Sequence, residues 1–485
     1  METLLSCNVA DLSPYIPTIE NPWNAQKVQH LYRRLGAYAS KSQIEAALTQ
    51  TPTTLIESLI NEASTLALTP TPEWGYWVKS DFDASETPNY QYRRAWQKQA
   101  LQNLNTDGLR GRITLFWSNH FVTEAPVYQS AAYLFQYHHT LETHALGNFK
   151  TLTHAIGLTA PMLIYLNGYQ NRRGRPNENY ARELFELFTL GENVGYTQDD
   201  IVETARALTG WNEREVAWGP ITFDPSKFDD GEKTIFGQTG HWGYDDVIDI
   251  LFTERPTEIA QFICEKLYAY FISPVVDQTI VDGLAQTFLD ANFEIIPVLE
   301  QLFKSNHFFD KNAIGAIIAS PIDLLIGFFI SCDMNTSESF DDYSRFVPWC
   351  DAMGQEIFDP PDVAGWQGDK EWINATSFTN RWKYLDYLIN RFWQHDREQF
   401  RNFAVSVIGG NSTDPAFITK SIIDFFLSRE LNNQIEYDNA TDVFKEEVPQ
   451  NYFEEGLWDL NWGNATKQVR DLLYHIVRIP ELQLK

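Results

Sequence analysis

The sequence predicts a mostly α-helical fold: one large multi-helix globular domain with a short β-hairpin or ordered loop insertion. Apolar residues recur at spacings of three and four through most of the 485 residues, which is the period of an amphipathic helix. Glycines follow several of these periodic stretches, at the position where helices commonly end. Strand-like runs are confined to residues 211–240. These three observations favour helices packed on helices.

The first third of the chain reads as a succession of helices. Gly36 and Gly147 each follow a periodic stretch and are expected to end a helix. The predicted helices span residues 25–35, 53–63, 90–104, 109–121 and 130–146. Two more helices follow, from residue 177 to Gly191 and from Thr197 to Gly210. The loop between them is short, so these two helices should lie antiparallel.

A different pattern occupies the segment between Trp211 and Gly240. The strand-like runs 221–223 and 233–236 flank turn-rich residues there, which indicates a short hairpin or an ordered loop. Helical periodicity resumes near Tyr244 and recurs to about Leu302, and another helical run spans 378–392.

Composition changes near residue 395. Beyond His395, acidic and Asn-rich segments separate shorter apolar runs. We therefore expect an N-terminal lead segment, 1–22, a main helical domain, 23–395, and a C-terminal helical extension, 396–485.

The net charge of the chain indicates which classes of binding partner it disfavours. The chain has 37 Lys and Arg against 65 Asp and Glu, a formal net charge of −28. This acidic excess disfavours nucleic acid and anionic lipid surfaces. The only dense basic run, Arg172-Arg173-Gly174-Arg175, lies in a loop, and it is either solvated or an anion clamp beside the acidic helices. No nucleic-acid partner is predicted.

Several cofactor and compartment signatures are missing from the sequence. The four cysteines, Cys7, Cys264, Cys332 and Cys350, have neither zinc-module nor disulfide-framework spacing. No phosphate-binding loop, serine nucleophile elbow or His-Glu-x-x-His helix occurs, so no metal site is predicted and the cofactor is left open. The N-terminus has no signal-peptide pattern, and no run is apolar enough to span a bilayer. We expect a cytoplasmic protein without membrane insertion.

The 177–210 hairpin holds the densest group of ionisable residues. Helical spacing places Asn179, Glu183 and Glu186 on one side of its first helix, opposite an apolar face. The second helix adds Glu203 and Arg206, which could face Arg182, Glu183 and Glu186 across the hairpin. The structural interpretation is a set of ion pairs, Glu178–Arg182 and Arg182–Glu186, closed by an interhelical bridge from Arg206.

The functional interpretation of the same hairpin is a catalytic or binding cluster. Crowding of Glu183, Glu186 and Glu203 would raise their proton affinities and leave one as an acid and another as a base. Asn179, Arg182 and Arg206 would then bind a polar or anionic ligand.

Two positions outside the hairpin are further candidates. His120 follows an apolar stripe, so it is either a core histidine bonded to a neighbouring backbone or carboxylate, or a general base or ligand that reaches the acidic cluster. Trp366 follows the rigid Asp359-Pro360-Pro361-Asp362 turn. This region is either a packed connection, or Trp366 and Trp372 line a pocket suited to sugars or aromatic ligands.

A family resemblance rests on several motifs. They are Phe116–Phe121, Asn177–Leu184, Gly195–Thr197, Ala205–Trp211, Asp229–Thr234, Phe262–Leu267 and Pro360–Trp366. Together these segments resemble the bacterial domain of unknown function 1800 family, from about Trp23 until the resemblance fades after about residue 395.

The resemblance indicates a family but no catalytic mechanism. No activity is established for the family as a whole, so no catalytic residue is carried over. Many relatives look exported, and neighbouring genes suggest a domain of unknown function 1501 protein as a partner. Where many relatives have histidine, this chain has Phe188 and Phe228, so a metal site built on those histidines is not expected.

Two classes of function follow. The first is a hydrolase-like enzyme or a binder of a polar ligand, with its cleft formed by the 177–210 hairpin. The second is a non-catalytic interaction protein, in which the same charges only hold the hairpin together.

Overall fold

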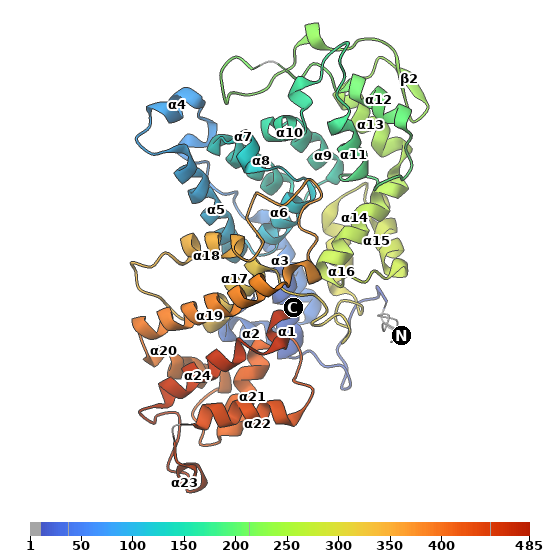
Figure 1. Cartoon of the computed structure of the whole chain (residues 1–485). Helices are drawn as coiled ribbons and strands as arrows, with labels where there is room; N and C mark the ends of the chain where they lie inside the picture. The colour runs from blue at the N-terminus through green and yellow to red at the C-terminus, as the bar shows by residue number, and fades with distance from the viewer. Residues whose placement is uncertain (1–10, 37, 213, 447) are drawn as a thin grey trace.

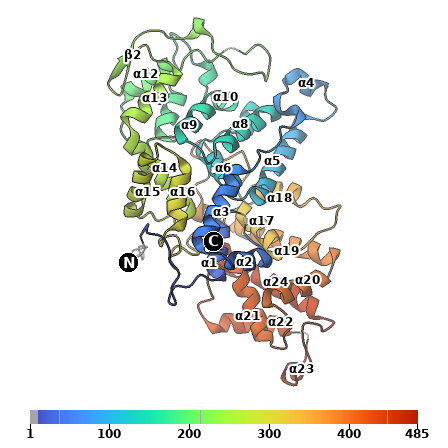
Figure 2. The ribbon, with the colours of Figure 1, turned by 180° about the vertical axis from the view of Figure 1, so that it is seen from behind.

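Helices make up nearly all of the regular structure and are stacked in three levels (Figures 1 and 2). The computed structural model describes residues 11–36, 38–212, 214–446 and 448–485. Cys7 and the segment searched for a signal peptide lie outside the described residues. The predicted fold class, mostly α with a short two-stranded insertion, is confirmed.

The first half of the chain forms the upper level and part of the middle level in Figure 1. Its helices are α1 Ala25–Leu35, α2 Lys41–Leu48, α3 Pro52–Thr65, α4 Lys79–Ala84, α5 Asn89–Thr106, α6 Leu109–His120, α7 Ala125–Tyr128, α8 Ala131–His144, α9 Phe149–Gly157, α10 Ala160–Tyr165, α11 Asn179–Glu186 and α12 Gln198–Ala207.

The second half completes the middle level and forms the lower one. Its strands are β1 Lys233–Ile235 and β2 Gln238–Gly240, and its helices are α13 Tyr244–Glu254, α14 Pro256–Phe271, α15 Gln278–Asp290, α16 Ile295–Lys304, α17 Pro321–Cys332, α18 Asp342–Asp351, α19 Ala375–His395, α20 Glu398–Ile408, α21 Pro415–Phe426, α22 Gln434–Lys445, α23 Gln450–Glu454 and α24 Ala465–Ile476. Short 3₁₀ helices span 73–76, 168–170, 225–227, 369–372 and 480–483. Helix α19 ends at the predicted boundary, while the division into a main domain and an extension stays a prediction.

The small sheet differs from the expected hairpin. Strand β1 pairs antiparallel with β2, Thr234 lying opposite Thr239, and residues 221–223 form no strand of this sheet. The turn between the strands consists of Phe236 and Gly237, both with positive φ. Two successive residues with positive φ form a two-residue hairpin turn, and the twist of this turn matches the twist of two antiparallel strands. The closest partner for β1 is therefore the next segment of the chain.

Helix α6 runs through the middle of the molecule and is buried over most of its length. Its Trp117 is fully buried, donates a hydrogen bond from Nε1 to the Ala145 carbonyl at 2.9 Å, and stacks on Phe149. Gly111 lets α6 approach α5, because a Cβ there would lie 2.5 Å from the Asn103 carbonyl oxygen. The position of α6 is therefore set by packing on several sides.

A buried ion cluster joins α6 to α17. The Asp323 carboxylate accepts from Arg112 Nη1 at 2.5 Å and from the Lys485 ammonium. Arg112 also donates to the Gly36 carbonyl, from Nε at 3.2 Å. Ser320 caps α17 by accepting a hydrogen bond from the Asp323 backbone N–H. The first turn of the helix therefore also places the Asp323 carboxylate in the core.

The last residues return to the centre of the molecule, where both views place the end of the chain (Figures 1 and 2). Lys485 donates from its backbone N–H to the Ile317 carbonyl at 2.8 Å. Arg381 on α19 donates to the Gln483 side chain at 2.9 Å and to the Ala319 carbonyl at 2.8 Å. These bonds hold the Lys485 side chain against Asp323.

Within the described ranges, no helix combines the length and the apolar character needed to cross a bilayer.

The Asp323 cluster yields a prediction about stability. Burial favours protonation of Asp323, but the charges of Arg112 and Lys485 outweigh burial and hold its pKa well below its ordinary value. Asp323→Asn leaves two cations buried without a counter-charge and should lower the free energy of unfolding by about 3–5 kcal/mol. Urea denaturation measures the loss.

The matched control is Lys41→Gln, which removes an exposed ion pair with Glu45 and should cost less than about 0.5 kcal/mol. A depressed carboxyl pKa contributes stability above the unfolded-state pKa of about 3.9, and that contribution is lost as pH falls through the folded-state pKa. The deficit of Asp323→Asn should therefore persist from pH 8 to about pH 4. A loss below about 1 kcal/mol at neutral pH would show that the cluster does not hold the core.

Candidate functional site

Three of the motifs that carry the family resemblance meet at the C-terminal end of α6. This end contributes Asn119 and His120, α14 contributes Lys266, and the loop that follows Pro360-Pro361 contributes Trp366. In Figure 1 this loop passes beside α6. The convergence makes this region the first candidate for a functional site.

The loop is fixed to α6 through its backbone. Asn119 accepts from the Trp366 N–H at 2.7 Å and donates to the Trp366 carbonyl at 3.0 Å. Gly365 has a φ of +79°, and a Cβ there would lie 2.5 Å from Asn119 Oδ1. A glycine is therefore required where the loop meets the helix, and Trp366 is placed by its backbone, which leaves its ring to form part of a cavity.

His120 is a neutral, fully oriented imidazole. It is 4% exposed, and its Nε2 lies 3.0 Å from the Phe188 carbonyl, which can only accept, so Nε2 carries the proton. Nδ1 is then an acceptor, and Lys266 Nζ donates to it at 3.3 Å. Burial, and secondly the charge of Lys266, lower the pKa of His120 well below its ordinary value. His120 is thus bonded to the backbone, as the structural interpretation expects, and it also contacts a lysine.

Lys266 is the functional candidate that the sequence analysis missed. Its Nζ donates to the Leu187 carbonyl at 3.2 Å and lies 4.5 Å from the centre of the Phe262 ring. Burial lowers the pKa of Lys266 to about 8. One signal was present in the sequence: Lys266 follows Ile259 and Ile263 at helical spacing, so it falls on the apolar face of α14.

A cavity of about 300 Å³ lies beside this pair, large enough for one ring-shaped small molecule. Four aromatic side chains and several polar ones form its wall: Phe116, Tyr270, Trp366 and Trp372, with Asn119, His120, Lys266, Asp323, Gln355, Asp369 and Lys485. Trp366 and Trp372 both line this cavity, as the pocket interpretation of that turn expects, and so does His120; their roles in binding stay predictions.

The acidic hairpin is organised around Arg182. This side chain pairs with Glu178 at 3.1 Å and with Glu186 at 3.2 Å, as the structural interpretation expects, and it also donates to Gln198 at 3.1 Å. Asn179 donates to the Leu166 carbonyl at 3.2 Å. Glu183 is half-buried, and its pKa is raised by burial and then by Glu186, while Arg182 opposes the shift.

The expected bridge from Arg206 across the hairpin is wrong. Arg206 Nη1 pairs with Glu203 at 2.7 Å, and its Nε pairs with Asp229 at 3.0 Å. Among the described residues, no ion pair joins Arg206 to Glu183 or Glu186. The segment that leads into β1 packs on α12 and supplies Asp229, so Glu203 belongs to a second group of charges.

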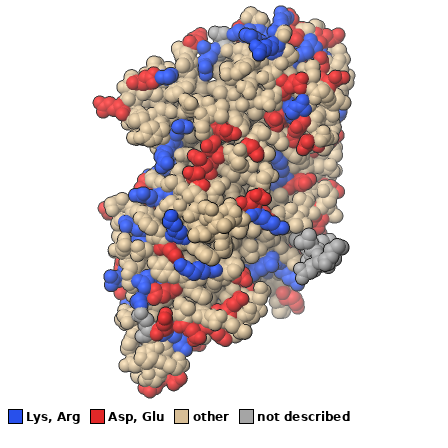
Figure 3. Space-filling model, viewed as in Figure 1, with Lys and Arg blue, Asp and Glu red and all other residues tan. Residues whose placement is uncertain are grey.

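Carboxylates gather on one face around Tyr165, whose hydroxyl donates to Glu124 at 2.7 Å. Burial and the nearby Glu124, Asp362 and Glu183 raise the pKa of Tyr165. Asp359 lies near Glu124, and its pKa is raised by burial and by that neighbour. Figure 3 shows acidic side chains grouped near the middle of this face. We call Glu124, Asp359, Asp362, Glu183 and Glu186 the acidic face.

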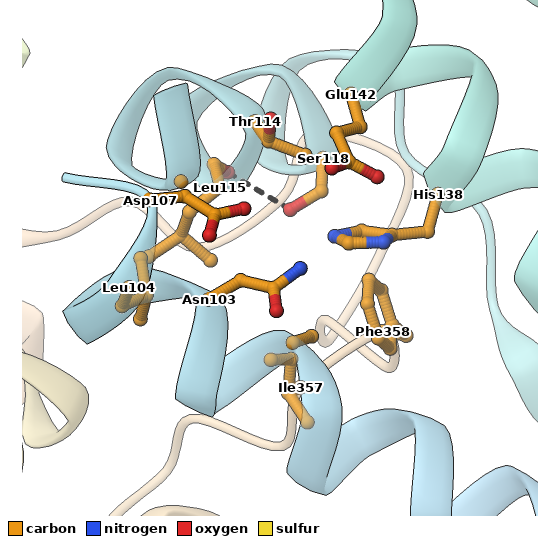
Figure 4. A pocket seen from close by; sticks show the side chains of 12 residues that line it. Asn103, Leu104, Asp107, Thr114, Leu115, Ser118, His138, Glu142, Ile357 and Phe358 are labelled. Carbon is orange, nitrogen blue, oxygen red and sulfur yellow. Dashed lines mark hydrogen bonds between the residues drawn. The ribbon is translucent and has the colours of Figure 1, made fainter. Parts of the chain in front are cut away.

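A second polar cavity lies between α5, α6 and α8 (Figure 4). Its volume of about 10 Å³ is enough for one water molecule and too small for a ligand. His138 Nδ1 and Glu142 Oε2 are buried without a hydrogen-bond partner in the protein. The other Glu142 oxygen accepts from the Thr69 N–H at 2.8 Å. The size and the polar lining of this cavity suit one water molecule in the core.

In the part of the chain that the structure describes, no three His, Cys, Asp or Glu side chains are grouped to hold a metal ion. Phe188 accepts a hydrogen bond from His120 through its carbonyl oxygen, and its ring centre lies 6.1 Å from that of the imidazole.

Comparison with known proteins identifies a family. A family described as Protein of unknown function (DUF1800) matches residues 30–484. The match continues well beyond residue 395, so the expected fading of the resemblance is wrong. No curated protein and no solved structure matches the chain.

The raised pKa of Glu183 yields a prediction. A raised carboxyl pKa means that the ionised form is disfavoured in the fold, so Glu183 costs stability at pH 7 and this cost disappears as pH falls below the unfolded-state pKa. Glu183→Gln should leave the melting temperature unchanged or raise it at pH 7. The advantage should shrink towards pH 4, where wild-type Glu183 is protonated.

The matched control is Glu186→Gln, which loses the contact with Arg182 and should bring no gain. Melting curves from pH 4 to pH 8 give both comparisons. A lower melting temperature for Glu183→Gln at pH 7 would show that Glu183 has a structural role instead. An unchanged or higher melting temperature for Glu183→Gln would support the view that the Glu183 charge is kept at a cost to stability, as charges at functional sites often are.

Proposed function

The chain belongs to the DUF1800 family of proteins of unknown function, and from that premise we propose that it binds a small polar molecule with an aromatic ring in the cavity beside Lys266. The proposal concerns the cavity between α6, α14 and the loop that carries Trp366.

The observation that carries the proposal is the contact of Lys266 with His120 in an aromatic wall. A buried lysine is costly, and a lysine that served packing alone would have no need of an oriented imidazole beside it. Polar groups that converge on an apolar pocket are the usual composition of a ligand site. The aromatic rings would stack on a flat ligand, and the polar groups would orient it.

The same pair offers acid–base chemistry. Lys266 donates to His120 Nδ1, which is free of its own proton, so a proton can pass between the two nitrogens. This pair supports an enzyme acting on the bound ring compound, as in the hydrolase-like interpretation. The roles of Glu183, Glu186 and Glu203 as acid and base, and of Asn179, Arg182 and Arg206 as ligand contacts, stay predictions.

Ligand binding is tested with 4-hydroxybenzyl alcohol, an aromatic ring with polar groups at both ends. It should quench tryptophan fluorescence and raise the melting temperature. Trp366→Leu removes one aromatic wall and should cost about 1 kcal/mol of binding free energy, about a five-fold weaker Kd.

The matched control is Trp242→Phe, next to β2, whose wild-type indole donates to the Gln238 carbonyl away from the cavity. This variant should bind as wild type does. Methyl glucoside is the comparison ligand: tighter binding of the sugar would overturn the aromatic preference. If neither compound shifts the melting temperature, the cavity is not a ligand site of this class.

A second candidate function is supported by the acidic face. Burial, and secondly the neighbouring carboxylates, raise the pKa values of Glu183 and Asp359, and a basic surface docked on them would offset the repulsion between these carboxylates. The proposed partner is a domain of unknown function 1501 protein with a basic surface.

The partner is tested by gel filtration of the two purified proteins together. Co-elution at about 0.1 M salt should be lost at about 1 M, because salt screens exposed charges. Lysine substitutions at Glu124, Asp359 and Asp362 should abolish co-elution, whereas Glu436→Lys and Asp438→Lys on α22 should not. Separate elution at low salt would contradict the pairing.

A further inference from the structure

We propose that Lys266 is a carbonyl-reactive lysine, and that the ligand of the cavity carries an aldehyde or ketone that condenses with its Nζ. This inference rests on the proposed function, because the ring compound must enter the cavity to meet the amine. It adds the reactive group of the ligand and the residue that bonds to it.

The hydrogen bonds of Lys266 determine how its nitrogen is presented. Two groups that can only accept lie beside Nζ: the Leu187 carbonyl at 3.2 Å and His120 Nδ1 at 3.3 Å. His120 can only accept because its Nε2 proton is donated to Phe188. Both N–H bonds of a neutral amine are therefore directed to protein acceptors.

One position on the nitrogen remains. In an ammonium it is a third N–H, and in an amine it is the lone pair. Apart from the Phe262 ring, whose centre lies 4.5 Å from Nζ, the described part of the chain offers Nζ no third acceptor, and Lys266 forms part of the cavity wall. The two hydrogen bonds therefore suit a neutral amine and leave its lone pair for the contents of the cavity.

The surroundings of Lys266 also enlarge the fraction of its neutral form. No carboxylate pairs with Lys266 among the described residues, and burial lowers its pKa to about 8. Burial also lowers the pKa of the other lysine of the cavity, Lys485, to about 8, but Lys485 pairs with Asp323, which stabilises its ammonium form. The two lysines therefore differ in their partners, and Lys266, which has no carboxylate partner among the described residues, is the nucleophile.

The condensation balances without any further reagent. The Lys266 lone pair adds to the carbonyl carbon, and His120 Nδ1 takes one proton from the nitrogen and passes it to the former carbonyl oxygen, which gives a neutral carbinolamine. His120 Nδ1 then takes the second N–H proton and delivers it to the hydroxyl group, which leaves as water while the C=N bond forms. The products are one imine on Lys266 and one water molecule.

The test is reductive trapping with 4-hydroxybenzaldehyde and cyanoborohydride on the full chain at pH 7, followed by peptide mapping. An ordinary lysine has a pKa of about 10.4, so an amine with a pKa of about 8 has a far larger neutral fraction. Lys266 should be modified about 10-fold or more in excess of Lys150, a surface lysine paired with Asp249. Trapping at Lys266 should rise with pH up to about 8 and then level off.

Two variants sharpen the comparison. Lys266→Arg keeps the charge but has no amine that forms an imine, so trapping at this position should disappear while the surface background stays. Lys150→Arg should leave trapping at Lys266 unchanged. Because the wild-type peptide map already ranks the lysines, the result does not depend on the folding of a variant.

The outcomes separate this inference from the proposed function. If 4-hydroxybenzyl alcohol binds but Lys266 is modified no more than Lys150, the cavity is a ligand site and Lys266 is not carbonyl-reactive. If the alcohol fails to bind and Lys266 is not trapped, both proposals fall. Preferential trapping at Lys266 with the expected pH dependence supports the inference.

Discussion

The carboxylate of Asp323 is the constraint on which the middle of the molecule depends. It is buried between Arg112 on α6 and Lys485, two cations that would otherwise lie in the core without a counter-charge. The interaction joins α6, α17 and the end of the chain at one point. A buried charge tolerates few arrangements, because each of its oxygens must have a donor. The relative placement of these three segments is therefore narrowly defined.

The same ion cluster also fixes the positions of the residues in the candidate site. Arg112 and His120 lie on the same rigid helix, so fixing one end of α6 at Asp323 also fixes the imidazole at the other end. Asn119 then holds the Trp366 backbone, and α14 brings Lys266 to His120. Asp323 and Lys485 also line the cavity. The ion cluster and the cavity are thus one structural unit.

The parts of the site that could be predicted are those whose signal is local. His120 and Trp366 stood out because a histidine after an apolar stripe and a tryptophan after a rigid turn are visible in a few residues of sequence. Lys266 was missed because a single lysine on the apolar face of a helix is a weak signal. Its long side chain could also reach solvent, and its partners lie on distant segments of the chain. The partner of Arg206 was misassigned for a similar reason, since Asp229 reaches it through the fold of the β1 segment. The strand pairing of residues 221–223 failed because the tight turn at Phe236 and Gly237 offers β1 a closer partner.

The amino-acid sequence was sufficient to predict the helical class, many helix positions, the pairs Glu178–Arg182 and Arg182–Glu186, and the family. All of these depend on residues within a few positions of one another or on short motifs. Other features come from the folded chain: Asn119, Lys266 and Trp366 meet, Asp323 pairs with Arg112 and Lys485, and the hairpin charges fall into two groups. The two sets of features differ in the sequence separation of the interacting residues. Helix periodicity and capping depend on residues within one or two turns, whereas buried contacts join segments that are far apart in the sequence and that packing brings together.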